Sequence, residues 1–286
     1  MLFNNPGRKI IIIIALWLYI GVNDSVCQEL FGHQPLIEDE LTQGVVWRYY
    51  HYNTSDGMQS INILILDQTT NNYRLSIAIE DTSLVYTSEL AIRNKALAAI
   101  NGSFFDMKKG GSVVFLQKDK NVINQSVRKD RFTDEAAFAI DKKGEVSIIK
   151  KPDDGWKKNG KYHDILSSGP LLLFHGQEEA ITDDAFNNNR HPRTAIGLTA
   201  GKQLLLVTVD GRNKQAIGMS IAELSQLMQE TGCTDALNLD GGGSTTFWIK
   251  DRTANGIVNY PSDNKTFDHK GERKVANAVL VLPVKR

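Results

Sequence analysis

The chain has few cysteines, and neither sign of charge is in excess. Cys27 and Cys233 are its two cysteines among 286 residues, and 33 basic side chains balance 33 acidic ones. Proteins that bind nucleic acid need a basic excess to neutralise phosphates, so this balance argues against a nucleic-acid partner. The remaining composition, 41% hydrophobic and 23% charged, is that of an ordinary globular protein. Any phosphate contact must therefore come from a few local arginines.

The apolar run near the start of the chain is too short to span a membrane. Residues 10–22 form a 13-residue apolar run behind Arg8 and Lys9, whereas a spanning helix needs about 20 residues. A short basic region followed by such a run is typical of a secretory signal peptide. We expect residues 1–27 to be that signal, with cleavage after Cys27, and the protein to be exported to the periplasm, the cell surface or the medium.

Two consequences follow from cleavage after Cys27. The mature chain keeps only Cys233, so it can form no internal disulfide, and we expect this thiol to be buried as a small hydrophobic group. A lipoprotein with an acylated Cys27 is the alternative. It is disfavoured because Asp24-Ser25-Val26 lacks the leucine and small residues of such a processing site.

Several common catalytic and ligand-binding motifs are missing. The sequence has no Gly-x-Ser-x-Gly elbow, which disfavours a serine hydrolase. It has no Gly-Lys-Ser/Thr ending of a nucleotide P-loop and no calcium loop with alternating oxygen ligands. The six histidines are scattered without metal-ligand spacing, and only His191 stands near a motif. No cofactor is expected, although a divalent metal near Asp210 and Asp240 stays open.

The most distinctive segment that is present runs from Ala236 to Thr246. Leu237 and Leu239 alternate with polar or small residues, which predicts a strand. Asp240 ends this strand and is followed by three glycines and then hydroxyl side chains. Glycine is needed where the backbone turns sharply or approaches a ligand closely. A plain Asp-Gly turn between two strands is the alternative, but it needs one or two glycines.

Four other segments place polar residues at strand ends. They are Asn101-Gly102-Ser103-Phe104-Phe105, Arg193-Thr194, Asp210-Gly211-Arg212 and Arg273-Lys274-Val275-Ala276-Asn277-Ala278. Together with the Asp240 motif, and in this order, they resemble the phosphodiester glycosidase family. The resemblance covers residues 96–283. We expect one domain over 28–286, in which 28–95 is an N-terminal extension without resemblance.

The patterning predicts an α+β fold with an α/β-like core: a mixed, strand-rich sheet with few helices. Hairpins are predicted for 136–140 with 145–149, for 195–198 with 203–209, and for 60–66 with 73–79. Helices are predicted for 88–95 and 220–231, the second with a Ser220–Glu223 capping box and a stop at Gly232.

The strand 203–209, the helix 220–231 and the strand 236–239 predict a right-handed β-α-β unit. In such a unit Asp210 and Asp240 lie at the carboxyl ends of two parallel strands, which is where ligand crevices form in open α/β sheets. The polar segment 251–270 lies between the Asp240 motif and Arg273, and we expect it to border the site.

The resemblance implies hydrolysis of a sugar 1-phosphodiester, such as an N-acetylglucosamine 1-phosphodiester, at the glycosidic C–O bond. A carboxylate stabilises the cationic anomeric carbon in such a reaction, and arginine holds phosphate in a bidentate fork. We predict Asp240 as nucleophile, base or cation stabiliser, Asp210 as its partner, and Glu80 as a third acidic candidate. The predicted substrate-binding residues are Asn101, Phe104, Arg193, Thr194, Arg212, Gly241, Gly242, Gly243, Ser244, Thr245, Arg273 and Asn277.

Among these residues, Arg193 and Arg273 are expected to grip the phosphate, and Asn101 and Asn277 to bind the sugar. Two other functions remain possible. One is a metal-dependent phosphodiesterase that breaks the P–O bond. The other is a non-catalytic protein that binds glycans or assists exopolysaccharide assembly, since fold does not determine function. Each of these readings has a carbohydrate or sugar-phosphate partner, and the sequence does not indicate the oligomeric state.

Overall fold

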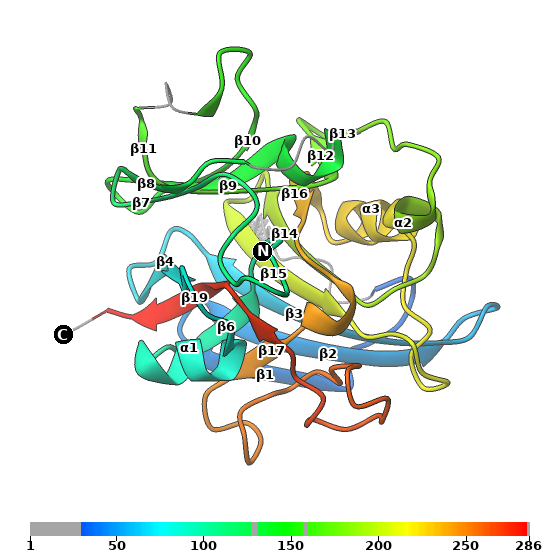
Figure 1. Cartoon of the computed structure of the whole chain (residues 1–286). Coiled ribbons are helices and arrows are strands. Elements are labelled where there is room, and N and C mark those ends of the chain that lie inside the picture. The colour runs from blue at the N-terminus through cyan, green and yellow to red at the C-terminus, as the bar shows by residue number, and fades with distance from the viewer. Residues whose placement is uncertain (1–29, 127–130, 157–159, 285–286) are drawn as a thin grey trace, which may run out of the picture.

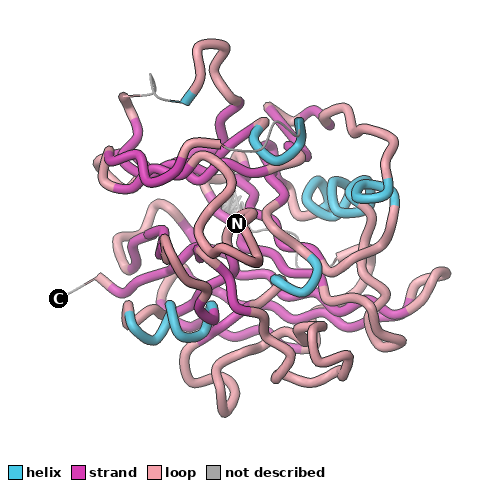
Figure 2. The backbone as a smooth tube through the Cα atoms, viewed as in Figure 1, coloured by secondary structure: helices cyan, strands magenta, loops and turns pink. Residues whose placement is uncertain are grey.

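Strands dominate the structure, a computed structural model that describes residues 30–126, 131–156 and 160–284 (Figures 1 and 2). The predicted signal peptide lies outside these ranges. The largest sheet has eight strands, in the order β1 (Ile37–Thr42), β2 (Val45–Asn53), β3 (Met58–Asp67), β15 (Gln203–Val209), β14 (Arg193–Thr199), β16 (Cys233–Asn238), β12 (Leu171–Phe174) and β13 (Gln177–Glu178).

Three smaller sheets complete the strand framework. The first has the order β10 (Val146–Lys150), β9 (Ala136–Asp141), β11 (Tyr162–Ser168), β7 (Leu116–Lys118) and β8 (Asn121–Asn124). The second has the order β17 (Phe247–Ile249), β6 (Ala98–Asn101), β19 (Asn277–Pro283) and β4 (Tyr73–Ile79). The third pairs β18 (Lys274–Val275) with β5 (Val85–Tyr86).

Three α-helices and two 3₁₀ turns are described. They are α1 (Thr87–Arg93), α2 (Ala185–Asn188), α3 (Ile221–Glu230), η1 (Arg131–Asp134) and η3 (Gly242–Ser244). The predicted capping box of α3 is present, because Ser220 Oγ accepts from the Glu223 N–H while the Glu223 carboxylate accepts from the Ser220 N–H. Gly232 follows the helix with φ +82°, which explains the predicted stop. In the described ranges, no helix has the length and apolar character needed to cross a membrane.

The prediction of a mixed sheet is wrong, because every strand pair in the described part of the chain is antiparallel. The strands β15 and β16 do run in the same direction, and α3 connects them. They are not neighbours, however, since β14 lies between them and is antiparallel to both. The β-α-β unit therefore straddles a third strand, which short-range periodicity cannot indicate.

Two predicted hairpins are confirmed and one is wrong. The strands β9 and β10 pair around their turn, as do β14 and β15. The third expectation, pairing of 60–66 with 73–79, fails because β3 already has β2 on one edge and β15 on the other. The strand β4 pairs instead with β19, the last strand of the chain.

The main core lies between the three larger sheets. It brings together Leu206 and Ile196 from the eight-stranded sheet, Phe138 from the five-stranded sheet, and Ile100 and Val279 from the four-stranded sheet. A second cluster forms where α3 covers the opposite face of the large sheet, and it includes the buried Cys233 thiol, as expected. The helix α1 covers the outer face of the four-stranded sheet (Figure 1). This packing leaves the strand ends free to carry polar groups.

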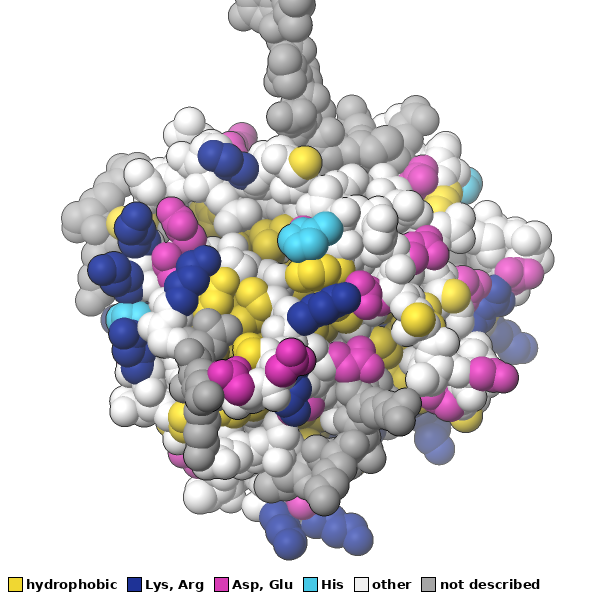
Figure 3. Space-filling view, turned by 90° about the horizontal axis from the view of Figure 1, so that it is seen from above, with side chains coloured by type: hydrophobic (Ala, Val, Ile, Leu, Met, Phe, Trp, Pro, Cys, Tyr) yellow, Lys and Arg dark blue, Asp and Glu magenta, His cyan; other side chains and the backbone are white. Residues whose placement is uncertain are grey.

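The face seen from above carries both signs of charge. Acidic and basic side chains lie beside one another there, with hydrophobic side chains visible between them (Figure 3). This mixture is the surface counterpart of the balanced composition.

Candidate functional site

Asp210 and Asp240 lie at the same edge of the eight-stranded sheet. Asp210 follows Val209, which pairs with Arg193 on β14, and Asp240 comes two residues after Asn238, which pairs with Ala195. Two strand spacings of about 4.8 Å therefore separate the two chain segments, roughly 10 Å in all. The antiparallel strand between them contributes its amino end, Arg193, to the same edge.

Asn101 joins the four-stranded sheet to this edge. Its Nδ2 donates to the Asp240 carbonyl at 2.6 Å, and its Oδ1 accepts from Thr194 Oγ1 at 2.8 Å and from the Thr246 N–H at 3.1 Å. Thr194 Oγ1 also lies 3.4 Å from Thr245 Oγ1. All these side chains are buried. Asn101 and Thr194 therefore hold the Asp240 turn in place. The side-chain amide of Asn101 already binds groups of the protein.

Asn277 supports the turn that follows Asn101. Its Oδ1 accepts from the Ser103 N–H at 2.6 Å, and its carbonyl accepts from the Gly102 N–H at 3.0 Å. A Cβ on Gly102 would lie 2.1 Å from Asn277 Oδ1, so only glycine fits there. The Nδ2 of Asn277 is buried and has no hydrogen-bond partner within the described residues.

The three glycines after Asp240 are each required by a different neighbour. A Cβ on Gly241 would lie 2.6 Å from the Pro192 carbonyl, which also accepts the Gly242 N–H at 2.7 Å. Gly242 has φ +61° and faces the guanidinium of Arg212, and a Cβ on Gly243 would lie 2.0 Å from an Asp263 carboxylate oxygen. The turn thus passes at contact distance under the charged side chains of Arg212, Asp263 and Arg273, which a plain hairpin turn does not require.

Arg193 is a structural arginine in this geometry. It is 1% exposed, and it donates to the carbonyls of Met219, Phe186 and Asn189 at 2.7–2.9 Å. Its guanidinium also lies 4.9 Å from the Phe186 ring centre. Burial, together with the charge of nearby Arg212, lowers its pKa to about 10. Arg193 therefore anchors the segment before α3, and we do not assign it the phosphate.

Arg273 forms a bidentate ion pair. Its Nε and Nη2 each donate to one oxygen of Asp263 at 2.7 Å, over Gly243. Asp263 belongs to the segment 251–270 that we expected to border the site. With its fork already filled by a carboxylate, Arg273 is not free to grip a phosphate in the way the sequence suggested.

Arg212 is the arginine whose guanidinium is open. It is exposed and carries φ +62°, an uncommon conformation for a residue other than glycine. Its Nη2 would lie 2.9 Å from a Cβ on Gly242, so the guanidinium rests on the glycine turn. Across the described part of the chain it forms no hydrogen bond or ion pair.

Burial and the charges of Arg193 and Arg212 lower the pKa of neighbouring His191.

Asp210 lies beneath this surface and is fully hydrogen-bonded. Its Oδ2 accepts from Ser60 Oγ at 2.6 Å, and its Oδ1 accepts from Asn259 Nδ2 and from the Tyr260 N–H, both at 2.9 Å. Burial raises the pKa of this carboxyl to about 6, although the three donors act in the opposite direction. Asp210 thus ties β3, β15 and the segment 259–269 together.

The contacts of Asp210 reveal residues that the motifs did not indicate. Ser60 lies on β3, before the region of family resemblance, and Asn259 lies in the turn-rich segment after β17. Asn259 Nδ2 also donates to the Thr245 carbonyl at 3.1 Å, so it links Asp210 to the glycine turn. In the sequence, Asn259 is indicated only by its place in the polar segment 251–270, which we expect to border the site.

The buried Asp210 should leave a pH signature in stability. A carboxyl whose pKa is raised in the folded state favours folding below pH 4 and loses that contribution as the pH rises through about 6. Asp210→Asn should remove this fall, which amounts to about 3 kcal/mol at 1.36 kcal/mol per pKa unit. Denaturant unfolding of both proteins from pH 4 to 8 measures the difference. Asp251→Asn, at an exposed turn, is the control. Equal pH slopes for Asp210→Asn and wild type would contradict the assignment.

Two of the predicted residues do not lie open at this edge. The Glu80 carboxylate accepts from Arg93 on α1 and from Ser83, and it has no hydrogen bond to the Asp240 network within the described residues. Phe104 is 7% exposed in the main core and packs edge-on against Phe186. These contacts are those of a surface ion pair and a core aromatic.

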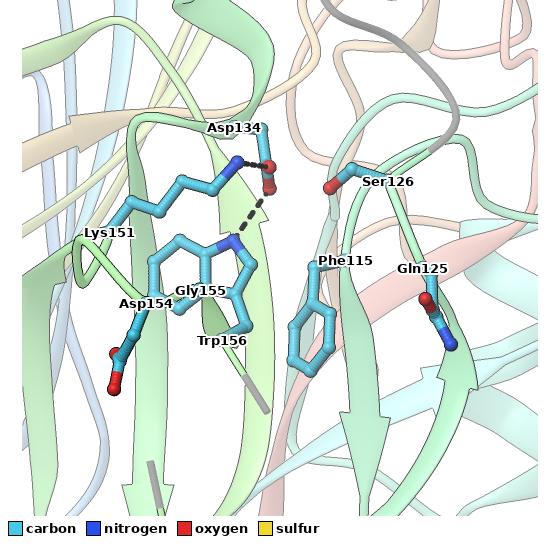
Figure 4. Close-up of a pocket in the computed structure, with 8 residues that line it drawn as sticks. All are labelled: Phe115, Gln125, Ser126, Asp134, Lys151, Asp154, Gly155 and Trp156. Atoms are coloured by element: carbon cyan, nitrogen blue, oxygen red, sulfur yellow. Dashed lines mark hydrogen bonds and ion pairs between the residues drawn. The ribbon is translucent and has the colours of Figure 1, made fainter. Parts of the chain in front are cut away.

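A separate cavity lies at the five-stranded sheet. Phe115 and Trp156 stack in its wall, and Asp134 accepts from Lys151 and from the Trp156 N–H (Figure 4). Among the polar groups drawn, Asp134, Lys151 and the Trp156 N–H bind one another. Elsewhere in the described ranges, no three histidine, cysteine, aspartate or glutamate side chains come together in a way that suits a metal ion.

The model of the phosphodiester glycosidase family matches residues 94–282, close to the range of 96–283 predicted from the motifs. The chain belongs to the phosphodiester glycosidase family.

Two curated relatives show low sequence identity to this chain, 24% and 28%. The mouse N-acetylglucosamine-1-phosphodiester alpha-N-acetylglucosaminidase is 28% identical over 181 residues, which cover 58% of this chain and 33% of the mouse protein. An uncharacterised prophage-derived protein of Bacillus subtilis is 24% identical over 221 residues, which cover 69% of this chain and 34% of that protein. The chain thus spans about a third of the length of these relatives.

Solved structures confirm the fold. The zebrafish N-acetylglucosamine-1-phosphodiester alpha-N-acetylglucosaminidase catalytic domain, auto-inhibited by its pro-peptide, superposes with a TM-score of 0.68 at 20% identity, covering 88% of this chain and 87% of that one. A hypothetical protein from Synechocystis gives a TM-score of 0.66 at 16% identity, covering 88% of this chain and 64% of that one.

Proposed function

We propose that this protein is an exported glycosidase that hydrolyses a sugar 1-phosphodiester, such as an N-acetylglucosamine 1-phosphodiester, at the bond between the anomeric carbon and the phosphate oxygen. The observation that carries the proposal is that Asp240 and Arg212 both lie at one glycine turn, Asp240 at its start and Arg212 against Gly242. A carboxylate begins the turn, and an unpaired guanidinium rests on Gly242. The names of the curated relatives support the choice of sugar and linkage.

These two groups suit the two ends of the bond that breaks. The guanidinium of Arg212 binds the phosphate with paired N–H donors, which stabilises the phosphomonoester as it leaves with the bonding electrons. The carboxylate of Asp240 stabilises the positive charge on the anomeric carbon and positions a water molecule that forms the new C–O bond. A phosphomonoester has a second pKa near 6 and needs little help from a general acid.

Asp210 is buried and is connected to the glycine turn through Asn259. Its contacts with Asn259, and those of Asn259 with Thr245, connect it to the turn that carries Asp240. Its burial and its three donors suit a carboxylate that orients other groups. We therefore propose Asp210 as a positioning residue and Asp240 as the catalytic residue.

Export is proposed from the sequence of residues 1–27 alone. A short basic region, an apolar run and a cleavage site after Cys27 support it.

The position of bond cleavage separates this proposal from its rivals. Hydrolysis of the methyl phosphodiester of N-acetylglucosamine 1-phosphate in heavy-oxygen water should place the label on the sugar hydroxyl, because water attacks carbon. A metal-dependent phosphodiesterase would place the label in the phosphate and lose activity with a chelator. Binding of the sugar without turnover would favour a glycan-binding protein. Mass spectrometry of both products measures the label.

A further inference from the structure

The peptide group between Asn259 and Tyr260 is hydrogen-bonded at both ends. Its carbonyl oxygen lies 2.7 Å from His269 Nδ1, and its N–H donates to Asp210 Oδ1 at 2.9 Å. A carbonyl oxygen only accepts, so Nδ1 of His269 carries the hydrogen. The imidazole, the peptide and the carboxylate therefore form a series in which each hydrogen bond polarises the next.

An aromatic stack keeps the imidazole in this position. The Tyr260 ring stacks on Phe267, with ring centres 3.8 Å apart, and on His269, with ring centres 4.5 Å apart. His51 on β2 continues the stack beyond Phe267 at 5.9 Å. The Tyr260 ring thus stacks on two neighbours, and turning it would break both contacts.

The side chain of Asn259 closes the same arrangement. Its Oδ1 accepts from the Phe247 N–H at 2.7 Å, while its Nδ2 donates to Asp210 and to the Thr245 carbonyl. A displacement of this one residue would move both the carboxylate and the glycine turn.

We infer that His269 is a positioning residue that acts on Asp210 through the peptide group joining Asn259 to Tyr260. The effect on catalysis rests on the proposed function, since it reaches Asp240 through Asn259 and Thr245. The effect on Asp210 itself is independent of any substrate.

Other groups also face this pair. Ser60 on β3 donates to Asp210, and the hydroxyl of Tyr49 on β2 lies 3.4 Å from Ser60 Oγ. Near His269, the Asp268 carboxylate is bound by Asn264 and by the Lys270 N–H. None of these hydrogen bonds uses the His269 side chain, but the charge of that side chain also acts on Asp210 and on Asp268, so the test has to separate the charge from the N–H donor.

Two substitutions separate the ring from its donor. His269→Phe keeps a ring for Tyr260 and removes the N–H, whereas His269→Asn places an amide donor near the position of Nδ1 and removes the ring. His51→Phe, at the far end of the stack, is the matched control. Each is made in the full chain and also with Asp210→Asn, and denaturant unfolding is followed from pH 4 to 8.

Loss of the donor should make the Asp210 anion less favourable. In His269→Phe we therefore expect the Asp210-dependent fall in stability to move to higher pH by roughly half a unit or more. His269→Asn and His51→Phe should keep the wild-type midpoint. With Asp210→Asn present, the upward displacement should vanish. The kcat of His269→Phe should fall several-fold with KM unchanged.

Two results would overturn the inference. One is an unchanged midpoint in His269→Phe, and the other is a loss of stability that is equal at every pH, as a merely structural role predicts. If no sugar phosphodiester is hydrolysed, the proposed function fails, but the stability profiles still decide the role of His269.

Discussion

Asp240→Asn should lower the turnover of a sugar 1-phosphodiester by at least ~10²-fold, because a positioned carboxylate typically contributes that much or more. The substitution keeps the size of the side chain and leaves the Asp240 carbonyl, which Asn101 binds, in place. Folding and substrate affinity should therefore be preserved. Steady-state kinetics with the methyl phosphodiester of N-acetylglucosamine 1-phosphate measure the effect, with the midpoint of thermal unfolding as a check on structure.

Asp251→Asn is a suitable control for this experiment. Asp251 is an exposed aspartate with φ +59°, a conformation that asparagine accepts readily. It should retain wild-type kinetics. Should Asp240→Asn also retain most of its turnover, the chemistry must be carried by a different carboxylate.

Arg212→Gln should reduce kcat/KM by roughly 10- to 100-fold, because hydrogen bonds to a charged group contribute about 1.5–3 kcal/mol. Arg212→Lys should lose less, since the charge survives while the fork does not. Arg74→Gln is the matched control: Arg74 is exposed at the start of β4 and has no ion pair in the described ranges.

Arg273→Gln distinguishes this assignment from the one suggested by the sequence. The Arg273 fork is filled by Asp263, so the substitution should destabilise the glycine turn and affect kcat/KM less than Arg212→Gln. If kcat/KM falls more in Arg273→Gln than in Arg212→Gln while stability is unchanged, Arg273 and not Arg212 binds the phosphate.

The parts of the fold that could be predicted are those with local signals. The capping box and Gly232 set the ends of α3, and short turns set the β9–β10 and β14–β15 hairpins. These signals act between residues a few positions apart, so the sequence displays them directly. The partner of a strand depends on distant residues, and for this reason the sequence pattern predicts the wrong partner for β4, which pairs with β19.

The candidate site shows the same division. The glycines at 102 and 241–243 show in the sequence where the chain turns without side chains, and the structure places a neighbouring group close to each of them. The sequence also determined the family, through motifs in a fixed order. The three arginines look alike in the sequence, and folding distinguishes them: Arg193 donates to carbonyls, Arg273 pairs with Asp263, and Arg212 has neither kind of partner among the described residues. Whether a charge is available depends on partners from distant segments, and packing alone brings those partners together.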